Sequence, residues 1–374
     1  MRTNYISSQS RGDCSGGWSG LSFNLYEKLA GHARLGVNYI GPVYPGASRL
    51  DRVVSKLWRI TGCGGRFFFF SEERLRRIEK QLRASLPPGD YNLFLGATPW
   101  VRFHPEKPYG AYLDACFRTY FDNNLKTEEF SVEDIRRIEL AEKDWLERAR
   151  HVFWASAWSR DEAIRHYQLS KDNHHVVGIG GNLEVPEADT YSGGLLFLFI
   201  AQNFALKGGP AACAALQGVR RSQPDAKLVV LGEKPPVEFL QQPGVEYAGF
   251  LRKDRPEELA RFRSILASAF CLVHPTNSDM VPQVIIECGC FGCPAIAPSR
   301  FAIPELVLNR QTGVLIDTPF TAADFEREML WMIENQAAYE DMRRKARAHL
   351  ISGFTFQAVA ERVASRIKSE GMNP

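Results

Sequence analysis

Short apolar runs alternate with longer amphipathic stretches over most of the chain. Runs such as Tyr91 to Leu95 (YNLFL) have the length of a buried strand, and stretches such as 72–85 have the period of an amphipathic helix. This alternation predicts an α/β protein with doubly wound, Rossmann-like parallel sheets. We expect strands at 37–41, 66–70, 91–95, 109–113, 152–155, 175–179, 195–200, 227–231, 245–248, 271–274, 295–297 and 313–316, and helices at 21–30, 72–85, 132–150, 160–167, 210–219, 256–267, 283–291, 322–350 and 356–369.

The alternation is interrupted at 182–194, where proline, acidic residues and paired glycines indicate a linker. We therefore expect a first domain at 1–185 and a second domain at 186–352. The remaining segment, 353–374, is expected to be a C-terminal helix able to pack back on the first domain. Ligands of doubly wound sheets bind outside the carboxyl ends of the strands, which predicts a cleft between the two domains.

Charge and hydropathy narrow the class of protein. The 46 basic and 43 acidic side chains leave a formal net charge of only +3, which gives no reason to expect nucleic acid as a partner. The most apolar run, 193–201, is far shorter than the roughly 20 residues of a membrane-spanning helix. The polar start, Met1 to Ser10, lacks the features of a secretory signal. We therefore expect a cytoplasmic protein.

Eight cysteines are scattered along the chain. In a long chain with no export signal, free thiols in a reducing compartment are expected. Cys288, Cys290 and Cys293 lie close together, but a second ligand pair at matching spacing is missing from the sequence. We interpret the three as small buried side chains and predict no metal site.

One candidate for chemistry is the segment Lys207-Gly208-Gly209-Pro210, which follows the expected strand at 195–200. Glycines let backbone N–H groups approach an anion, proline suits the first turn of a helix, and the helix dipole favours negative charge. Lys207 adds a cation suited to a diphosphate. The alternative is an exposed lysine in an ordinary turn, because Lys-Gly alone is a weak motif.

A second candidate is the carboxylate pair of Asp279 and Glu287 in DMVPQVIIE. Pro282 fits a helix start, so Asp279 would precede the helix and Glu287 would lie in its second turn. Two carboxylates at fixed separation are suited to accept hydrogen bonds from sugar and ribose hydroxyls. The alternative makes Asp279 a partner of the helix dipole and Glu287 a solvated residue.

These motifs resemble retaining glycosyltransferases of family 4, which have the GT-B fold. The resemblance is carried by HPTNSDMVPQVIIECGCFGCPAIAP, IPELV and TGVLID, and by FIAQNFALKGG and VEYAGFL. It is looser in KPYGAYLDACFRTYFDN, VFWASAWSRDEAIRHY and GIGGN. It implies two Rossmann-like domains that face each other across a deep cleft, with the acceptor on the first and the nucleotide sugar on the second.

The resemblance also implies a role for each matching position. Lys207 would bind the diphosphate, Asp279 the donor sugar, and Glu287 the ribose hydroxyls. Asp114 stands where the family often has a catalytic histidine. The other donor-binding positions that it implies are Gly16, Gly17, Gln202, Gly208, Phe250, Leu251, Met280 and Val281.

Three positions depart from the family pattern. Asp279 replaces a glutamate, so its reach is one methylene shorter, and Gln202 stands where an arginine is usual. Asp114, in place of histidine, would be repelled by a diphosphate unless it contacts the acceptor or is protonated. An equally weighted alternative makes Asp114 the cap of a helix from Ala115 onward.

The family implies transfer of a hexose with retention of configuration and without a required metal. The donor is expected to be UDP-linked, with UDP-glucose as the guess, and the acceptor a polysaccharide, an oligosaccharide or a lipid-linked glycan. The basic helix 72–85 either touches the cytoplasmic membrane face or is a solvated surface.

Two other functions fit the same fold. One is a sugar-nucleotide epimerase. The other is a non-catalytic subunit that binds nucleotide sugar, for which Gln202 and Asp114 argue. The Lys207 segment and the Asp279–Glu287 pair favour transfer over both.

Overall fold

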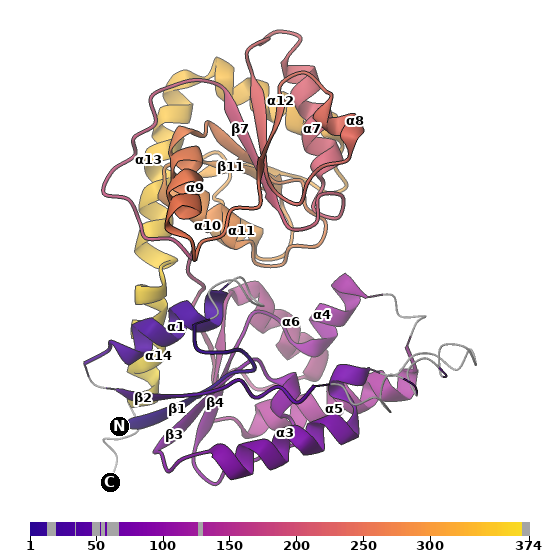
Figure 1. Ribbon diagram of the computed structural model, residues 1–374, viewed down its shortest axis with the longest axis vertical. Helices are drawn as coiled ribbons and strands as arrows, with labels where there is room; N and C mark the ends of the chain where they lie inside the picture. Colours follow the sequence, from indigo (N-terminus) through magenta and orange to yellow (C-terminus); the bar gives the residue numbers. More distant parts are fainter. Residues whose placement is uncertain are drawn as a thin grey trace. The chain divides into compact units, whose positions relative to one another are not determined.

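The computed structural model describes residues 1–12, 20–33, 35–46, 53, 57, 67–125 and 130–368. The chain divides into two compact units (Figure 1). Unit 1 comprises Met1–Gly178 and Phe356–Pro374, and unit 2 comprises Ile179–Thr355. The boundary between the units lies after Gly178, seven residues before the boundary expected after residue 185.

Unit 1 is built on a six-stranded sheet in the order β2-β1-β3-β4-β5-β6, and all its neighbouring strands are parallel. Figure 1 shows helices on both sides of this sheet. The strands are β1 Arg2–Ile6, β2 Gly36–Ile40, β3 Tyr91–Leu95, β4 Tyr109–Leu113, β5 His151–Trp154 and β6 His174–Val176. The helices are α1 Leu21–Ala30, α3 Glu72–Ser85, α4 Phe117–Asn124, α5 Val132–Arg148, α6 Ala157–Tyr167 and α14 Phe356–Lys368, with short 3-10 helices at Phe68–Phe70 and Thr98–Trp100.

The prediction of a strand at 66–70 is wrong. Phe68–Phe70 forms a 3-10 helix, and Phe69 is 52% exposed. Phe67 is buried instead, and its ring stacks on that of Phe130 with centroids 3.9 Å apart. Its backbone N–H donates to the Asp134 carboxylate at 2.7 Å, so a side chain takes the donor that a sheet would need.

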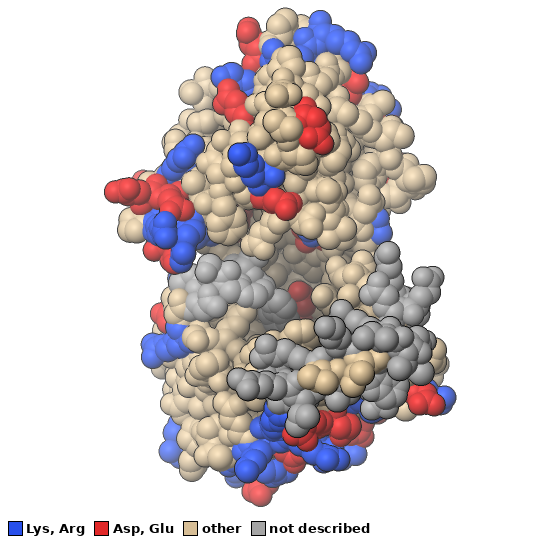
Figure 2. Space-filling view, turned by 45° about the vertical axis from the view of Figure 1, so that its right-hand side comes forward, with Lys and Arg blue, Asp and Glu red and all other residues tan. Residues whose placement is uncertain are grey.

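Helix α3 begins as the sequence predicts, with Ser71 as its N-cap. The Ser71 hydroxyl accepts a hydrogen bond from the Arg74 backbone N–H at 3.4 Å. The basic side chains of α3 do not form a purely positive face, because Arg77 pairs with Glu73 and Arg83 pairs with Glu79, each at 3.0 Å. Figure 2 shows the same interleaving of acidic and basic side chains on the surface it presents. Across the described part of the chain, no helix has the length and apolar character needed to cross a membrane.

Helix α14 packs on α1 within unit 1. It buries an apolar face that includes Val359 and Val363, and the Arg362 guanidinium donates to the Val177 carbonyl at 2.9 Å. The last described helix of the chain therefore completes the unit that contains the first strand.

Unit 2 contains a second six-stranded parallel sheet, in the order β12-β11-β10-β7-β8-β9. Its apolar core joins sheet residues such as Phe197 and Val273 to Leu216 on α7 and Met329 on α12. The strands are β7 Leu196–Ala201, β8 Lys227–Gly232, β9 Val245–Gly249, β10 Cys271–Val273, β11 Ala295–Pro298 and β12 Gly313–Ile316. The helices are α7 Gly209–Val219, α8 Val237–Leu240, α9 Pro256–Ser268, α10 Gln283–Cys290, α11 Ile303–Leu306, α12 Ala322–Glu334 and α13 Gln336–Gly353.

The strand order of unit 2 reverses between β7 and β10. From β7 the chain proceeds through β8 to β9 on one side, and β10 then pairs with the other side of β7. In open parallel sheets, ligands bind at such a switch point, outside the carboxyl ends of the strands. The loops after β7 and β10 therefore form the first place to look for a site.

Candidate active site

The loop after β7 is a tight turn that ends in the N-terminus of α7. Lys207 donates its backbone N–H to the Asn203 carbonyl at 3.1 Å, and the Asn203 side chain accepts from the Leu206 N–H at 2.8 Å. Gly208 caps the helix with φ 85°, and Pro210 lies in the first turn. This turn presents Lys207 beside a helix N-terminus, which is suited to an anion.

The loop after β10 is held by Thr276. Its hydroxyl accepts hydrogen bonds from the backbone N–H groups of Ser278 at 3.2 Å and Asp279 at 3.1 Å. The carbonyl of Pro275, one residue earlier, lies only 2.0 Å from where a Cβ on Gly208 would stand. The two loops therefore touch at the switch point.

Lys207 and Asp279 meet across these loops. The Lys207 ammonium lies 3.1 Å from Asp279 Oδ2, and both side chains remain about a quarter exposed, at 22% and 26%. His274 Nε2 lies 3.4 Å from the same oxygen. Burial by itself raises the pKa of Asp279, but His274 and Lys207 together outweigh it and lower that pKa below its ordinary value. Asp279 is therefore an anion at neutral pH, able to accept hydrogen bonds.

His274 is a feature of this site that sequence reasoning missed. Its side chain is 1% exposed, and neither ring nitrogen has a hydrogen-bond partner among the described residues. The imidazole instead makes the 3.4 Å electrostatic contact with Asp279 described above, which accounts for a polar ring at this buried position. The available signal was a histidine directly after the buried strand β10, five positions before the Asp279 carboxylate.

Glu287 lies on α10, which follows the Asp279 loop, and is only 2% exposed. Its Oε1 accepts from the Asn182 backbone N–H at 3.0 Å and pairs closely with the Lys253 ammonium. The prediction that Glu287 is freely solvated, offered as an alternative, is therefore wrong. Lys253 is a second residue that sequence reasoning did not find.

Comparison with known proteins gives a family match in unit 2, the half of the chain that holds Lys207 and Asp279. Residues 184–349 match the family model described as glycosyl transferases group 1. Unit 2 is therefore similar to group 1 glycosyltransferase domains, and we call it the group 1 domain. A glycogen synthase of Mycobacterium tuberculosis is 29% identical over 167 residues, which cover 42% of this chain and 38% of that protein. The chain thus matches well under half the length of this relative.

Solved structures share the fold of the whole chain. Sucrose-phosphate synthase from Thermosynechococcus elongatus matches with a TM-score of 0.67 and 14% identity, over 99% of both chains. Anabaena HepE, solved in complex with UDP-glucose, matches with a TM-score of 0.63 and 15% identity, over 98% of this chain and 99% of that chain. The chain therefore has the two-domain α/β fold of the GT-B type.

The other predicted donor-binding positions are spread over the group 1 domain and beyond. Met280 and Val281 are half-buried beside Asp279, and the Met280 carbonyl accepts from the Ala302 N–H at 3.1 Å. Gln202 is exposed in the loop after β7. Phe250, which is 54% exposed, and Leu251 follow β9. The predicted positions Gly16 and Gly17 lie outside the described residues.

Asp114 lies directly after β4 and belongs to unit 1, whereas Lys207 and Asp279 belong to unit 2. The alternative that made it a helix cap is wrong, because α4 begins at Phe117 with Cys116 as its N-cap. Instead, the Asp114 carbonyl accepts a hydrogen bond from the Ser159 hydroxyl at 2.5 Å.

Nearby, a buried carboxylate joins the helices of unit 1. Glu142 on α5 is fully buried and accepts from the Thr98 hydroxyl at 2.6 Å, the Phe117 N–H at 2.6 Å and the Tyr167 hydroxyl at 2.8 Å. Burial raises the pKa of Glu142, although the three donors oppose the shift. Because its lone pairs are engaged within the protein, we interpret Glu142 as structural.

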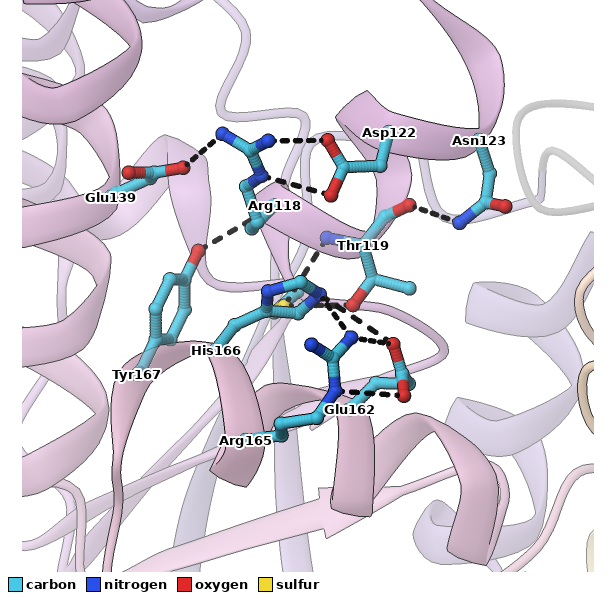
Figure 3. Close-up of polar contacts among 10 residues, drawn as sticks. Arg118, Thr119, Asp122, Asn123, Glu139, Glu162, Arg165, His166 and Tyr167 are labelled. Carbon is cyan, nitrogen blue, oxygen red and sulfur yellow. Dashed lines mark hydrogen bonds and ion pairs between the residues drawn. The ribbon is translucent and has the colours of Figure 1, made fainter.

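The charges around α4 and α6 are likewise matched within the protein (Figure 3). Arg118 pairs with Asp122 at 2.7 Å and with Glu139 at 3.0 Å, and Arg165 pairs with Glu162 at 2.6 Å. The Arg118–Glu139 pair ties α4 to α5, and the Arg165–Glu162 pair lies within α6. Neither arginine is therefore left unpaired for a diphosphate.

The cysteines that the structure describes show no sign of reactivity. The six within the described ranges are free and buried, and burial raises the pKa of Cys290 to about 12. A protonated, buried thiol is a poor nucleophile and a poor metal ligand. Among the described residues, no group of three or more His, Cys, Asp or Glu side chains is arranged to hold a metal ion.

Proposed function

We propose that the protein is a glycosyltransferase that moves a hexose from a nucleotide-diphosphate sugar to a glycan or lipid-linked acceptor. The observation that carries this proposal is the ion pair of Lys207 and Asp279 at the strand-order switch of a group 1 domain. A cation at a helix N-terminus and an ionised carboxylate meet there. They match the two ends of a sugar diphosphate, one anionic and one rich in hydroxyl groups.

Each residue then has a defined task. Lys207 and the N–H groups at the start of α7 bind the diphosphate, Asp279 accepts from a hydroxyl of the sugar, and Glu287 accepts from the ribose. HepE, which shares the fold, was solved with UDP-glucose, and this makes UDP-glucose the first donor to test. The glycogen synthase similarity favours a growing polysaccharide as acceptor.

The proposed reaction breaks the bond between the anomeric carbon and the diphosphate oxygen. The electron pair of that bond stays on the phosphate, where Lys207 and the helix N-terminus stabilise the new charge. The acceptor hydroxyl forms the new bond to the anomeric carbon on the same face, and its proton passes to the departing phosphate. We propose retention of configuration, and the charge stabilisation in this scheme comes from protein groups.

The test is transfer from UDP-glucose, and then from other nucleotide sugars, to mixed glycan acceptors. Lys207→Ala should raise the barrier by about 2–4 kcal/mol, a loss of about 30- to 900-fold in kcat/KM. Lys227→Ala is the matched control, because Lys227 lies at the amino end of β8, away from the loops at the carboxyl ends of β7 and β10, and pairs with exposed Glu246. Addition of EDTA tests the metal-independent scheme, which expects full activity.

Other outcomes assign the protein differently. Rapid formation of an epimer from the nucleotide sugar alone would make it an epimerase. Donor binding without hydrolysis or transfer, unchanged by Lys207→Ala, would make it a binding subunit.

A further inference from the structure

Lys253 is the one ammonium within the described residues that contacts the buried Glu287 carboxylate. Removing a carboxylate from water costs several kcal/mol unless it is paired and hydrogen-bonded. Glu287 is 2% exposed, so the Lys253 ammonium and the Asn182 N–H at 3.0 Å are what make its ionised form tolerable. Both donors converge on Oε1, and within the described residues no hydrogen bond engages Oε2, whose lone pairs can therefore accept from a ligand.

The loop between β9 and α9 is built to direct Lys253 inward. Its neighbours Arg252 and Asp254 pair with each other at 2.6 Å on the outside. The Arg252 backbone N–H donates to Glu258 in the first turn of α9 at 2.7 Å, which fixes the loop. Lys253 itself is 24% exposed, and its ammonium lies 5.1 Å from the ring centroid of Phe262. A cation held by a carboxylate and an aromatic face is well oriented.

We propose that Lys253 is a positioning residue that fixes Glu287 as a ribose-diol acceptor and thereby sets the preference for ribonucleotides. The inference rests on the proposed function, because it concerns the nucleotide of the same donor. The ligand class is a nucleoside diphosphate with free 2′ and 3′ hydroxyls. A carboxylate with one oxygen pinned presents its other oxygen in one direction, so the diol need not order it on binding.

The experiment compares a nucleoside diphosphate with its 2′,3′-dideoxy form. The probe is whichever of UDP, GDP and ADP binds the wild-type protein most tightly, measured by calorimetry. We expect the wild type to prefer the diol form. Lys253→Met should lower that preference about tenfold, because a hydrogen bond to an oriented charged group is weakened, while dideoxy affinity changes little. Lys253→Arg should restore most of the preference.

Two further variants protect the interpretation. If Lys253→Met fails to fold because Glu287 is left uncompensated, the double variant Lys253→Met with Glu287→Gln removes both charges and should fold without diol preference. Lys227→Met is the matched control, since it deletes an ammonium from an exposed pair and should leave the preference intact.

The outcomes separate this inference from the proposed function. If no nucleoside diphosphate binds the wild type, both fail. If the wild type prefers the diol form and Lys253→Met keeps or increases that preference, only the positioning role fails. An increase would mean that Lys253 competes with the ribose for Glu287.

Discussion

The contact between the two site loops can be tested by a single methyl group on Gly208. This residue has φ 85° and ψ 22°, a left-handed conformation that costs a non-glycine residue about 1–2 kcal/mol. A Cβ there would also lie 2.0 Å from the Pro275 carbonyl oxygen and 2.8 Å from its carbon. Both neighbours are backbone atoms, so the loops themselves must separate to admit it.

The size of the effect follows from these two contributions. Forcing backbone apart in a packed region costs about 1–3 kcal/mol, which added to the conformational strain gives about 2–5 kcal/mol for Gly208→Ala. The separation would also move Lys207 away from Asp279. In the wild-type protein the Lys207 ammonium lies 3.1 Å from the Asp279 carboxylate. We therefore expect Gly208→Ala to lose nucleotide affinity as well as stability.

The assay is hydrogen exchange of unit 2 peptides at increasing urea, which reports the opening of this unit even if the units unfold separately. Gly193→Ala is the matched control, because Gly193 has φ 101° and open space within 4 Å of the added Cβ. It should lose only the strain, about 1–2 kcal/mol. Equal losses in the two variants, or unchanged nucleotide binding by Gly208→Ala, would refute the argument.

Two further predictions concern unit 1. Glu142→Gln should change the free energy of unfolding by less than about 1 kcal/mol, since the amide oxygen can accept from Phe117 and Tyr167 while its NH2 group donates to the Thr98 hydroxyl. Glu142→Ala should cost about 3–5 kcal/mol by leaving buried donors unpaired, and urea unfolding distinguishes the two variants. Burial, with lesser effects of His175 and Arg160, lowers the pKa of His174 from 6.5 to about 4. Its stabilising contribution is present above pH 6.5 and is lost as the pH falls toward 4, up to about 3 kcal/mol. His174→Asn should flatten this pH dependence in acid unfolding, and an unchanged profile would contradict the assignment.

Elements with strong local signals were predictable from the sequence. Helices α1 and α3 and strands β3 and β4 have the expected bounds, because their periodicity and caps are properties of neighbouring residues. Strand β1 was not expected, because its first half is polar. In the structure, Asn4 on β1 is buried and donates to the Asn92 side chain at 3.1 Å, a partner 88 residues away.

The candidate site shows the same division. Lys207 and Asp279 were identified from local motifs, and the structure brings them together, while their catalytic roles stay predictions. Lys253 was missed because nothing near it in the chain shows what it faces, and His274 was missed because its position after a buried strand does not show that its ring contacts Asp279. Lys253 meets Glu287 only because the β9–α9 loop and α10 lie side by side, a consequence of strand order rather than of spacing.

The return of α14 to unit 1 has a consequence for synthesis of the protein. The apolar surface of α1 is covered by α14, which is synthesised only after all of unit 2. During translation, unit 2 is one continuous segment and can fold as soon as it is synthesised. Unit 1 exposes the apolar surface of α1 until α14 is complete. A chain that stops shortly before Phe356 would therefore lack the helix that covers α1. We expect the group 1 domain of such a chain to fold, and unit 1 to be destabilised and to aggregate.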